Sequence, residues 1–133
     1  MRVDPARSRT MAAVKSKNTT PEMAVRRLAH SLGYRYRLHY AGLTGKPDMV
    51  FPVRRAVIFV HGCFWHGHNC KRGARVPKTN TAYWKAKICG NVTRDVVNIN
   101  AIRSDGWRVL VIWECQTKDQ ERLKRVLRRF LER

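Results

Sequence analysis

Two short apolar runs joined by one long helical pattern constrain the fold of this chain more than any other feature. The runs are AVIFVH at residues 56–61 and WRVLVIW at 107–113, and each has the length and composition of a buried strand. Between them, apolar residues recur at helical spacing through residues 81–104. If this helix is a right-handed crossover, the two strands lie parallel in one sheet, which predicts an α/β fold. The expected apolar stripe of the helix consists of Trp84, Ile88, Val92, Val96, Ile99 and Ile102.

A hairpin is expected just before this crossover. DMVFPV at 48–53 and the first apolar run are separated only by Arg54-Arg55, which indicates two antiparallel strands. With a two-residue turn, Asp48 faces His61 at the open end of the hairpin. Arg-Arg is a poor sequence for such a turn, so a longer loop with a shifted register stays open.

Three further segments are expected to complete a small mixed β-sheet flanked by helices. The strict alternation in YRYRLHY at 34–40 predicts a half-buried strand. A helix is predicted to begin after the N-cap Thr20 and to end at Gly33, with Ala24, Leu28 and Leu32 on one face. A second amphipathic helix follows from the apolar spacing of residues 123–131.

The charge of the chain points to a polyanionic partner. It has 28 Lys and Arg against 9 Asp and Glu, a net charge of +19. Its 133 residues suffice for one domain, so we expect a basic amino-terminal arm over 1–18 and a folded domain over 19–133. The sequence has no apolar run long enough for a membrane span and no signal-peptide pattern at its start, which predicts a cytoplasmic protein with reduced thiols.

Three of the four cysteines fall beside the ends of the predicted strands, with a histidine among them. Cys63, His68, Cys70 and Cys115 form a Cys3His set of the kind that holds structural zinc in a closed tetrahedral site. The alternative is that they are small buried hydrophobic residues, an interpretation that suits Cys89 in the long helix.

The chain has only 9 acidic residues, so each can be considered as a candidate for catalysis. Asp48 stands at the entrance to an apolar strand, and an acid facing His61 in a phosphate-binding protein would repel its ligand unless a divalent cation lay between them. His61 and His66 flank one loop and could act as acid or base. Asp95 has two interpretations, a residue facing that loop or an ion-pair partner of Arg94 or of a neighbouring lysine.

Aromatic residues in the same loop indicate a surface that binds a partner. Phe64 and Trp65 lie on an irregular basic segment, where an exposed aromatic pair can insert between base pairs. Trp84 is either a third inserting residue or a core residue of the helix stripe.

These motifs resemble those of the very short patch repair (Vsr) endonucleases, which nick DNA at T:G mismatches left by deamination of 5-methylcytosine. The likeness rests on RSRTMAAVKSKNTTPE, GKPDMVF, VIFVHGCFWHGHNC and WRVLVIWEC. It implies a restriction-endonuclease-like fold related to the PD-(D/E)XK nucleases. The second acid and the lysine of that wider superfamily are absent after Asp48, where Val60-His61-Gly62 stands instead.

The resemblance also implies roles for individual residues. Asp48 and the main-chain carbonyl of Val60 would bind magnesium, and Glu22 would contact its water shell. His66 would be the general base, oriented by Asp95, while His61 would assist at the scissile phosphate. The implied zinc ligands are Cys63, His68, Cys70 and Cys115. Phe64, Trp65 and Trp84 would intercalate on the major-groove side, while the arm at 1–18 would clamp the minor-groove side.

The resulting hypothesis is a magnesium-dependent enzyme that nicks one strand of duplex DNA at T:G mismatches. The resemblance implies a bacterial protein near the nucleoid, with functional links to a cytosine-5 DNA methyltransferase and to mismatch repair proteins. One short site on a duplex needs only a monomer. Two alternatives explain the charge and the aromatic residues without this chemistry: a non-catalytic zinc-stabilised DNA-binding module and an RNA-directed protein.

Overall fold

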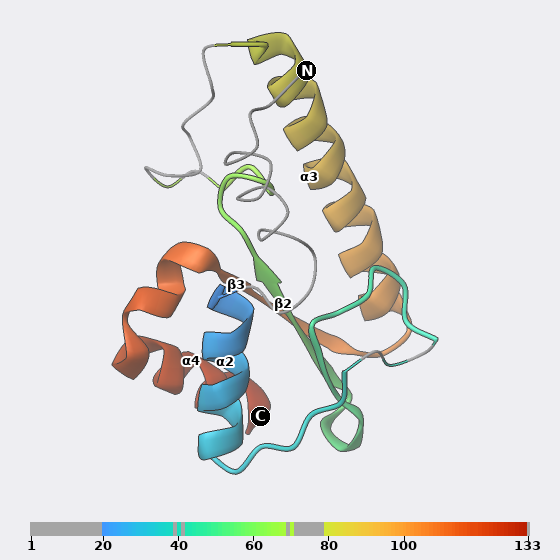
Figure 1. The fold of residues 1–133 in the computed structure, drawn as a ribbon. Helices are drawn as coiled ribbons and strands as arrows, with labels where there is room; N and C mark the ends of the chain where they lie inside the picture. The colour runs from blue at the N-terminus through green and yellow to red at the C-terminus, as the bar shows by residue number, and fades with distance from the viewer. Residues whose placement is uncertain (1–19, 39, 41, 69, 71–78, 133) are drawn as a thin grey trace.

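A three-stranded sheet with helices on both faces forms the body of the protein (Figure 1). The computed structural model describes residues 20–38, 40, 42–68, 70 and 79–132, so the arm predicted at 1–18 lies outside the described residues. The elements are α2 (Thr20–Ser31), β1 (Met49–Phe51), η1 (Pro52–Arg54), β2 (Ala56–His61), α3 (Thr81–Ser104), β3 (Arg108–Trp113), η2 (Glu114–Lys118) and α4 (Gln120–Leu131). The prediction of a small mixed α/β domain is confirmed.

The crossover that dominates the sequence is present. Strands β2 and β3 pair in parallel, with Ala56 opposite Arg108 and His61 opposite Trp113, and α3 connects them. The helix has the predicted bounds, and Gly106 follows it with a positive φ of 88°. Because equivalent ends of parallel strands meet at one edge, His61 and the residues after Trp113 lie at the same end of the sheet.

The hairpin is confirmed, but the register derived from a two-residue turn is wrong. Strand β1 pairs with β2 so that Phe51 lies opposite Ala56 and Met49 opposite Ile58. Pro52 opens a short 3-10 turn, and Arg55 closes it with a left-handed φ of 47°. The connection therefore takes four residues, and the direct pairing of Asp48 with His61 does not occur.

The predicted strand at 34–40 is reduced to one isolated bridge between Arg37 and Val50. Its edge partner β1 has only three residues, so the sheet offers no longer ladder there. The alternation sorts the side chains only in part: Tyr34 is buried while Arg35 and Arg37 are exposed, but Leu38, which the pattern places beside Tyr34, is 37% exposed. His39 lies outside the described residues.

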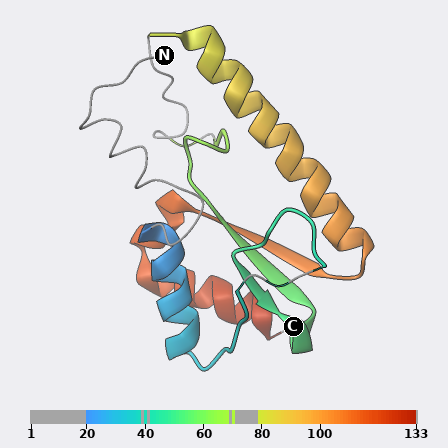
Figure 2. The same ribbon diagram turned by 45° about the vertical axis from the view of Figure 1, so that its right-hand side comes forward.

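The two faces of the sheet are covered by different helices (Figure 2). Helices α2 and α4 cover the face that carries Ile58 and Ile112, and α3 covers the face that carries Val57 and Phe59. In α4, Leu123, Leu127, Phe130 and Leu131 are buried as predicted, and Asp119 caps the helix by accepting a hydrogen bond from the Arg122 amide. None of the described helices is long and apolar enough to cross a membrane.

Helix α3 is only partly covered. Trp84 and Ile102 are buried as predicted, whereas Val92 and Val96 are 38% and 53% exposed. The 24 residues of α3 extend about 36 Å, while six-residue strands span about 20 Å, so the amino-terminal half of the helix projects past the sheet (Figure 1). For the same reason Cys89 is exposed, and its predicted burial is wrong.

Candidate active site

A pair of carboxyl groups lies where α2 approaches the open end of the hairpin. Glu22 is buried, and its side chain shares a hydrogen bond with Asp48, the residue before β1. Arg26, one turn further along α2, forms an ion pair with Glu22 at 2.6 Å. Burial, then the hydrogen bond to Glu22, raises the pKa of Asp48 to about 8. The pair thus lies in a place where a proton or a cation must offset its charge, and oxygen donors of this kind suit a hard divalent cation.

Strand β2 connects this carboxyl pair to a second group of polar side chains. The Asp48 Oδ2 atom accepts a hydrogen bond from the Val60 amide at 2.6 Å, beyond the end of β1. In a strand, the amide and carbonyl of one residue point to the same edge, so the Val60 carbonyl also faces the Asp48 side. The next side chain, His61, lies on the face of the sheet that α3 covers.

Two stacked imidazoles and one carboxylate form this second group. The rings of His61 and His66 are 3.8 Å apart and nearly parallel, at 4°. Asp95 on α3 places Oδ2 2.6 Å from His66 Nδ1 and 3.9 Å from His61 Nδ1. A carboxylate only accepts, so His66 Nδ1 donates to it and Nε2 remains as the basic nitrogen. Burial, then the charge of His66, lowers the pKa of His61 to about 4, which keeps this imidazole neutral near pH 7.

The loop that carries His66 is fixed to α3 by close packing. The backbone amides of His66 and His68 donate to the carbonyls of Gly62 and Cys63. Asn91 on α3 donates from Nδ2 to the Trp65 carbonyl at 2.8 Å. Gly67 has a φ of 64°, and a Cβ atom there would meet methyl groups of Val92 and Ile88 at 2.9 and 3.0 Å. A larger residue at this position would push the loop away from Asp95.

The thiol cluster predicted from the cysteine spacing forms beside the same loop. One donor atom each from Cys63, His68, Cys70 and Cys115 lies within 4.8 Å of the others. The Cys115 amide donates to Cys63 Sγ at 3.4 Å, which links the ends of β2 and β3. Burial raises the pKa of the Cys63 thiol to about 12, so a thiolate there needs an adjacent cation. Three sulfurs and one imidazole are a donor set that fits a tetrahedral metal site.

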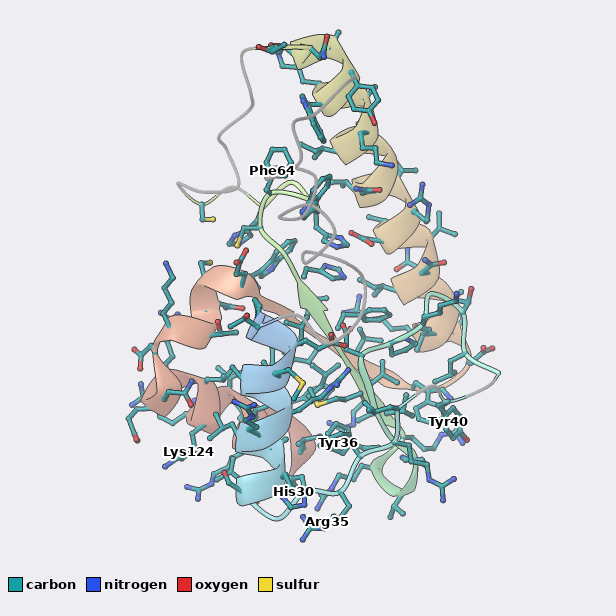
Figure 3. The ribbon with its side chains drawn as sticks, in the orientation of Figure 1. His30, Arg35, Tyr36, Tyr40, Phe64 and Lys124 are labelled. Atoms are coloured by element: carbon teal, nitrogen blue, oxygen red, sulfur yellow. The ribbon has the colours of Figure 1, made fainter. Side chains whose placement is uncertain are left out.

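The aromatic residues of the loop pack against α3. The rings of Phe64, Trp65 and Trp84 contact one another edge to face, with centroids 5.0 to 5.7 Å apart. Trp84 is 6% exposed, whereas Phe64 and Trp65 are half-buried. Figure 3 shows Phe64 beside the projecting half of α3. The expected exposed pair is therefore a partly covered cluster, closed on one side by Trp84.

The structure brings together the predicted residues in two groups rather than one. Glu22, Asp48 and the Val60 backbone form the first, and Asp95 joins His61 and His66 in the second. Of the two interpretations of Asp95, the one facing the loop is confirmed, since Arg94 contacts Asn91 instead.

Sequence reasoning missed three residues at this site. Arg26 could have been found from its position four residues after Glu22, the favourable order for an ion pair on a helix. Trp113, which stacks on His68 at 4.2 Å, precedes Cys115 by two residues and could have been suspected. The role of Asn91 depends on a tertiary contact and has no sequence signal.

Comparison with known proteins identifies the family. The family model described as DNA mismatch endonuclease Vsr matches residues 3–72. The chain is 52% identical to the Type II nicking enzyme V.XorIIP of Xanthomonas oryzae pv. oryzae, over 98% of this chain and 96% of that protein. It is 42% identical to the DNA mismatch endonuclease Vsr of Escherichia coli K12, over 88% of this chain and 74% of that protein. The chain therefore belongs to the Vsr family of DNA mismatch endonucleases.

Proposed function

We propose that this protein nicks one strand of duplex DNA at T:G mismatches and so begins very short patch repair, by magnesium-dependent hydrolysis of a phosphodiester. The observation that carries the proposal is the placement of a buried carboxyl pair and a His-His-Asp group at one end of β2, joined through Val60 and His61. The names of the relatives, which include nicking enzymes and a mismatch endonuclease, support cleavage of DNA.

Asp48 and the Val60 carbonyl are the proposed magnesium ligands, with Glu22 contacting the water shell. The buried oxygen donors fit this cation, since their charge has to be offset. When bound, Mg²⁺ would supply Lewis-acid stabilisation of the phosphate charge. Arg26 holds Glu22 in place by the ion pair at 2.6 Å.

His66 is the proposed general base. Its Nδ1 atom donates to Asp95, so Nε2 can take a proton from a water as the water oxygen bonds to phosphorus and the opposite P–O bond breaks. His61, held neutral by burial and stacked on His66, would assist at the scissile phosphate. Removal of one such proton-transfer group typically costs a factor of about 10² to 10⁴ in rate.

The remaining predicted residues would recognise the damaged duplex. Phe64, Trp65 and Trp84 are proposed to insert on the major-groove side, where unstacking costs least beside a mismatch. The arm at 1–18 would follow the minor-groove side. Zinc held by Cys63, His68, Cys70 and Cys115 would fix the loop that carries the aromatic residues. A single mismatch needs only a monomer, and a companion cytosine-5 DNA methyltransferase and mismatch repair proteins are the expected functional partners.

The test is a nicking assay on matched and T:G duplexes in varied flanking sequences, with and without Mg²⁺. Wild-type protein should nick only one strand of the T:G duplex and only with the cation. Asp48→Asn should bind that duplex with unchanged affinity and not nick it, while Asp105→Asn, at the exposed end of α3, should behave as wild type. Binding without cleavage by the wild type would favour the non-catalytic DNA-binding module, and equal cleavage of matched DNA would reject mismatch specificity.

A further inference from the structure

Lys46 has a backbone conformation that lysine rarely adopts, and it lies two residues before Asp48. Its φ is 50°, in the left-handed region, and the preceding Gly45 has a φ of 78°. Glycine occupies this region without penalty, whereas the Cβ atom of lysine crowds the neighbouring carbonyl oxygen there. Unfavourable backbone conformations of this kind are concentrated at functional sites, where the side chain has a role that offsets the cost. The turn thus indicates a function for the Lys46 side chain.

The turn that carries Lys46 is held against α3. A Cβ atom on Gly45 would meet the Asn98 side chain at 2.8 Å, so the turn and the helix are in close contact. Asn98 follows Asp95 by three residues in α3, and residues at this spacing are neighbours on the helix surface. In the other direction, the chain runs through one buried proline into Asp48. The turn therefore connects the carboxyl pair to the part of α3 that carries the acid of the His-His-Asp group.

The two groups together hold more acidic than basic side chains. Glu22, Asp48 and Asp95 contribute carboxyl groups, while the buried Arg26 is already paired with one of them at 2.6 Å. A phosphodiester brings a further negative charge, and its hydrolysis is accelerated by cations placed at the phosphate oxygens. Within the described part of the chain, Lys46 forms no ion pair, and its side chain is exposed.

The reach of a lysine side chain fits a phosphate bound beside Asp48. Two residues of extended chain span at most about 7 Å, so the Cα atoms of Lys46 and Asp48 lie within about 7 Å of each other. The ammonium group stands on a flexible four-carbon stem and carries three donors that rotate, which suits a phosphate oxygen. A phosphate held between the two groups is therefore within reach of the Lys46 ammonium.

We propose that Lys46 is a phosphate-binding residue of the active site. Its ammonium group binds a non-bridging oxygen of the phosphate that lies between the carboxyl pair and the His-His-Asp group, and it offsets the negative charge that develops there as the P–O bond breaks. Lys46 acts only as a cation and transfers no proton. Its effect on nicking rests on the proposed function, whereas its contact with a DNA phosphate does not.

Matched neutral variants test the effect on rate. Single-turnover nicking of the T:G duplex is measured with Mg²⁺ and with protein in excess, so that weaker binding does not limit the rate. We expect Lys46→Gln to nick at least about tenfold more slowly than wild type, because a donor to transition-state charge is lost, and Lys46→Arg to nick near the wild-type rate. Lys124→Gln, on α4 at the end of the molecule away from Phe64, should nick like wild type (Figure 3). Equal rates of Lys46→Gln and Lys124→Gln would overturn the proposal.

Lys46→Gly separates a role of the side chain from a role of the backbone. Glycine relieves the left-handed strain, so we expect a melting temperature at or above that of wild type, together with the same loss of nicking as in Lys46→Gln. A Lys46→Gly variant that nicks at the wild-type rate would show that this residue serves only the turn. A lower melting temperature would contradict the strain on which the proposal rests.

The salt dependence of binding tests the phosphate contact without cleavage. Each variant is combined with Asp48→Asn so that the T:G duplex stays intact, and affinity is measured by fluorescence anisotropy over a range of NaCl concentrations. Loss of one phosphate contact should lower the slope of log K against log salt by about 0.9 in Lys46→Gln and leave it unchanged in Lys124→Gln. An unchanged slope in Lys46→Gln would exclude the contact. A wild type that nicks no duplex would instead reject the proposed function, and the slope would then decide whether Lys46 binds a phosphate.

Discussion

At the scale of single residues, two consecutive residues of β2 belong to different groups of the site, Val60 through its backbone and His61 through its side chain. The Val60 amide binds Asp48 beside α2, and the His61 ring stacks on His66 beneath α3. This division follows from strand geometry alone, because the backbone groups of one residue point to an edge while successive side chains alternate between faces. A shift of β2 by one residue would turn the Val60 amide away from Asp48 and the His61 ring away from His66, so that neither group would form.

Arg26 gives a residue-scale prediction. Its side chain is 9% exposed and pairs with Glu22, which shares a hydrogen bond with Asp48. Arg26→Met leaves the carboxyl pair without its permanent cation, and loss of one member of a buried pair costs about 3–5 kcal/mol. We expect that loss in free energy of unfolding, measured by urea denaturation at pH 7 without added metal.

The neighbouring Arg27 provides a matched control, because its side chain is exposed on the same helix. Arg27→Met should change the free energy of unfolding by no more than about 0.5 kcal/mol. Equal stability of the two variants would show that Arg26 does not offset the charge of Glu22 and Asp48.

At the scale of elements, the contact between loop 62–68 and α3 decides the position of His66. Gly67→Ala places a methyl group 2.9 Å from Val92 on a backbone with a φ of 64°. We expect a loss of about 1–3 kcal/mol in stability from the strain and crowding, together with slower nicking as His66 moves from Asp95. Thermal unfolding and single-turnover nicking measure these effects.

Gly90→Ala, inside α3, is the opposite case. A Cβ atom there meets none of the described residues within 4 Å. This substitution should stabilise the protein by about 0.5–1 kcal/mol and leave nicking unchanged. A Gly67→Ala variant as stable and active as Gly90→Ala would mean that the loop tolerates displacement.

The thiol cluster gives a second prediction at this scale. Cys115→Ser removes a donor that connects the end of β3 to the end of β2. We expect loss of the thiol-bound zinc equivalent and a melting temperature lowered by several degrees, as chelation of zinc from the wild type should do. Cys89→Ser, at an exposed position on α3, should keep both the zinc and the melting temperature. Unchanged zinc content in Cys115→Ser would exclude the cluster as its site.

At the scale of the whole molecule, the net charge of +19 predicts strongly salt-dependent DNA binding. A protein that neutralises 6–10 phosphates loses about 10³–10⁵ in affinity between about 50 and 200 mM salt. We expect a loss of that order for matched duplex, measured by fluorescence anisotropy, and a parallel loss for the T:G duplex. A flat salt response would contradict phosphate binding by the basic surface.

How far the sequence predicts this molecule depends on the range of the interactions involved. The parallel pair β2–β3, the bounds of α3 and the gathering of Cys63, His68, Cys70 and Cys115 follow from local patterns and from the restriction-endonuclease-like Vsr family. The register of β1 could not be predicted, because it depends on the left-handed conformation of Arg55.

Other features depend on the lengths of the neighbouring helices and strands. Periodicity placed Val92 in the core, but the strands are too short to cover the amino-terminal half of α3, and Val96, in the other half, is 53% exposed although the same periodicity predicted its burial. The alternation at 34–40 indicated a strand, but β1 offers it one pairing position. Contacts such as Glu22 with Asp48 join segments far apart in the sequence, and no local pattern encodes their proximity.

The long crossover through α3 has a consequence for synthesis on the ribosome. His66 donates to Asp95 on α3, which is synthesised later, and Cys63 accepts a hydrogen bond from Cys115, which is synthesised later still. A growing polypeptide that ends before Asp95 lacks the acceptor of His66, and one that ends before Cys115 lacks the last donor of the thiol cluster. Both groups are therefore complete only after the segment that carries Cys115 has been made.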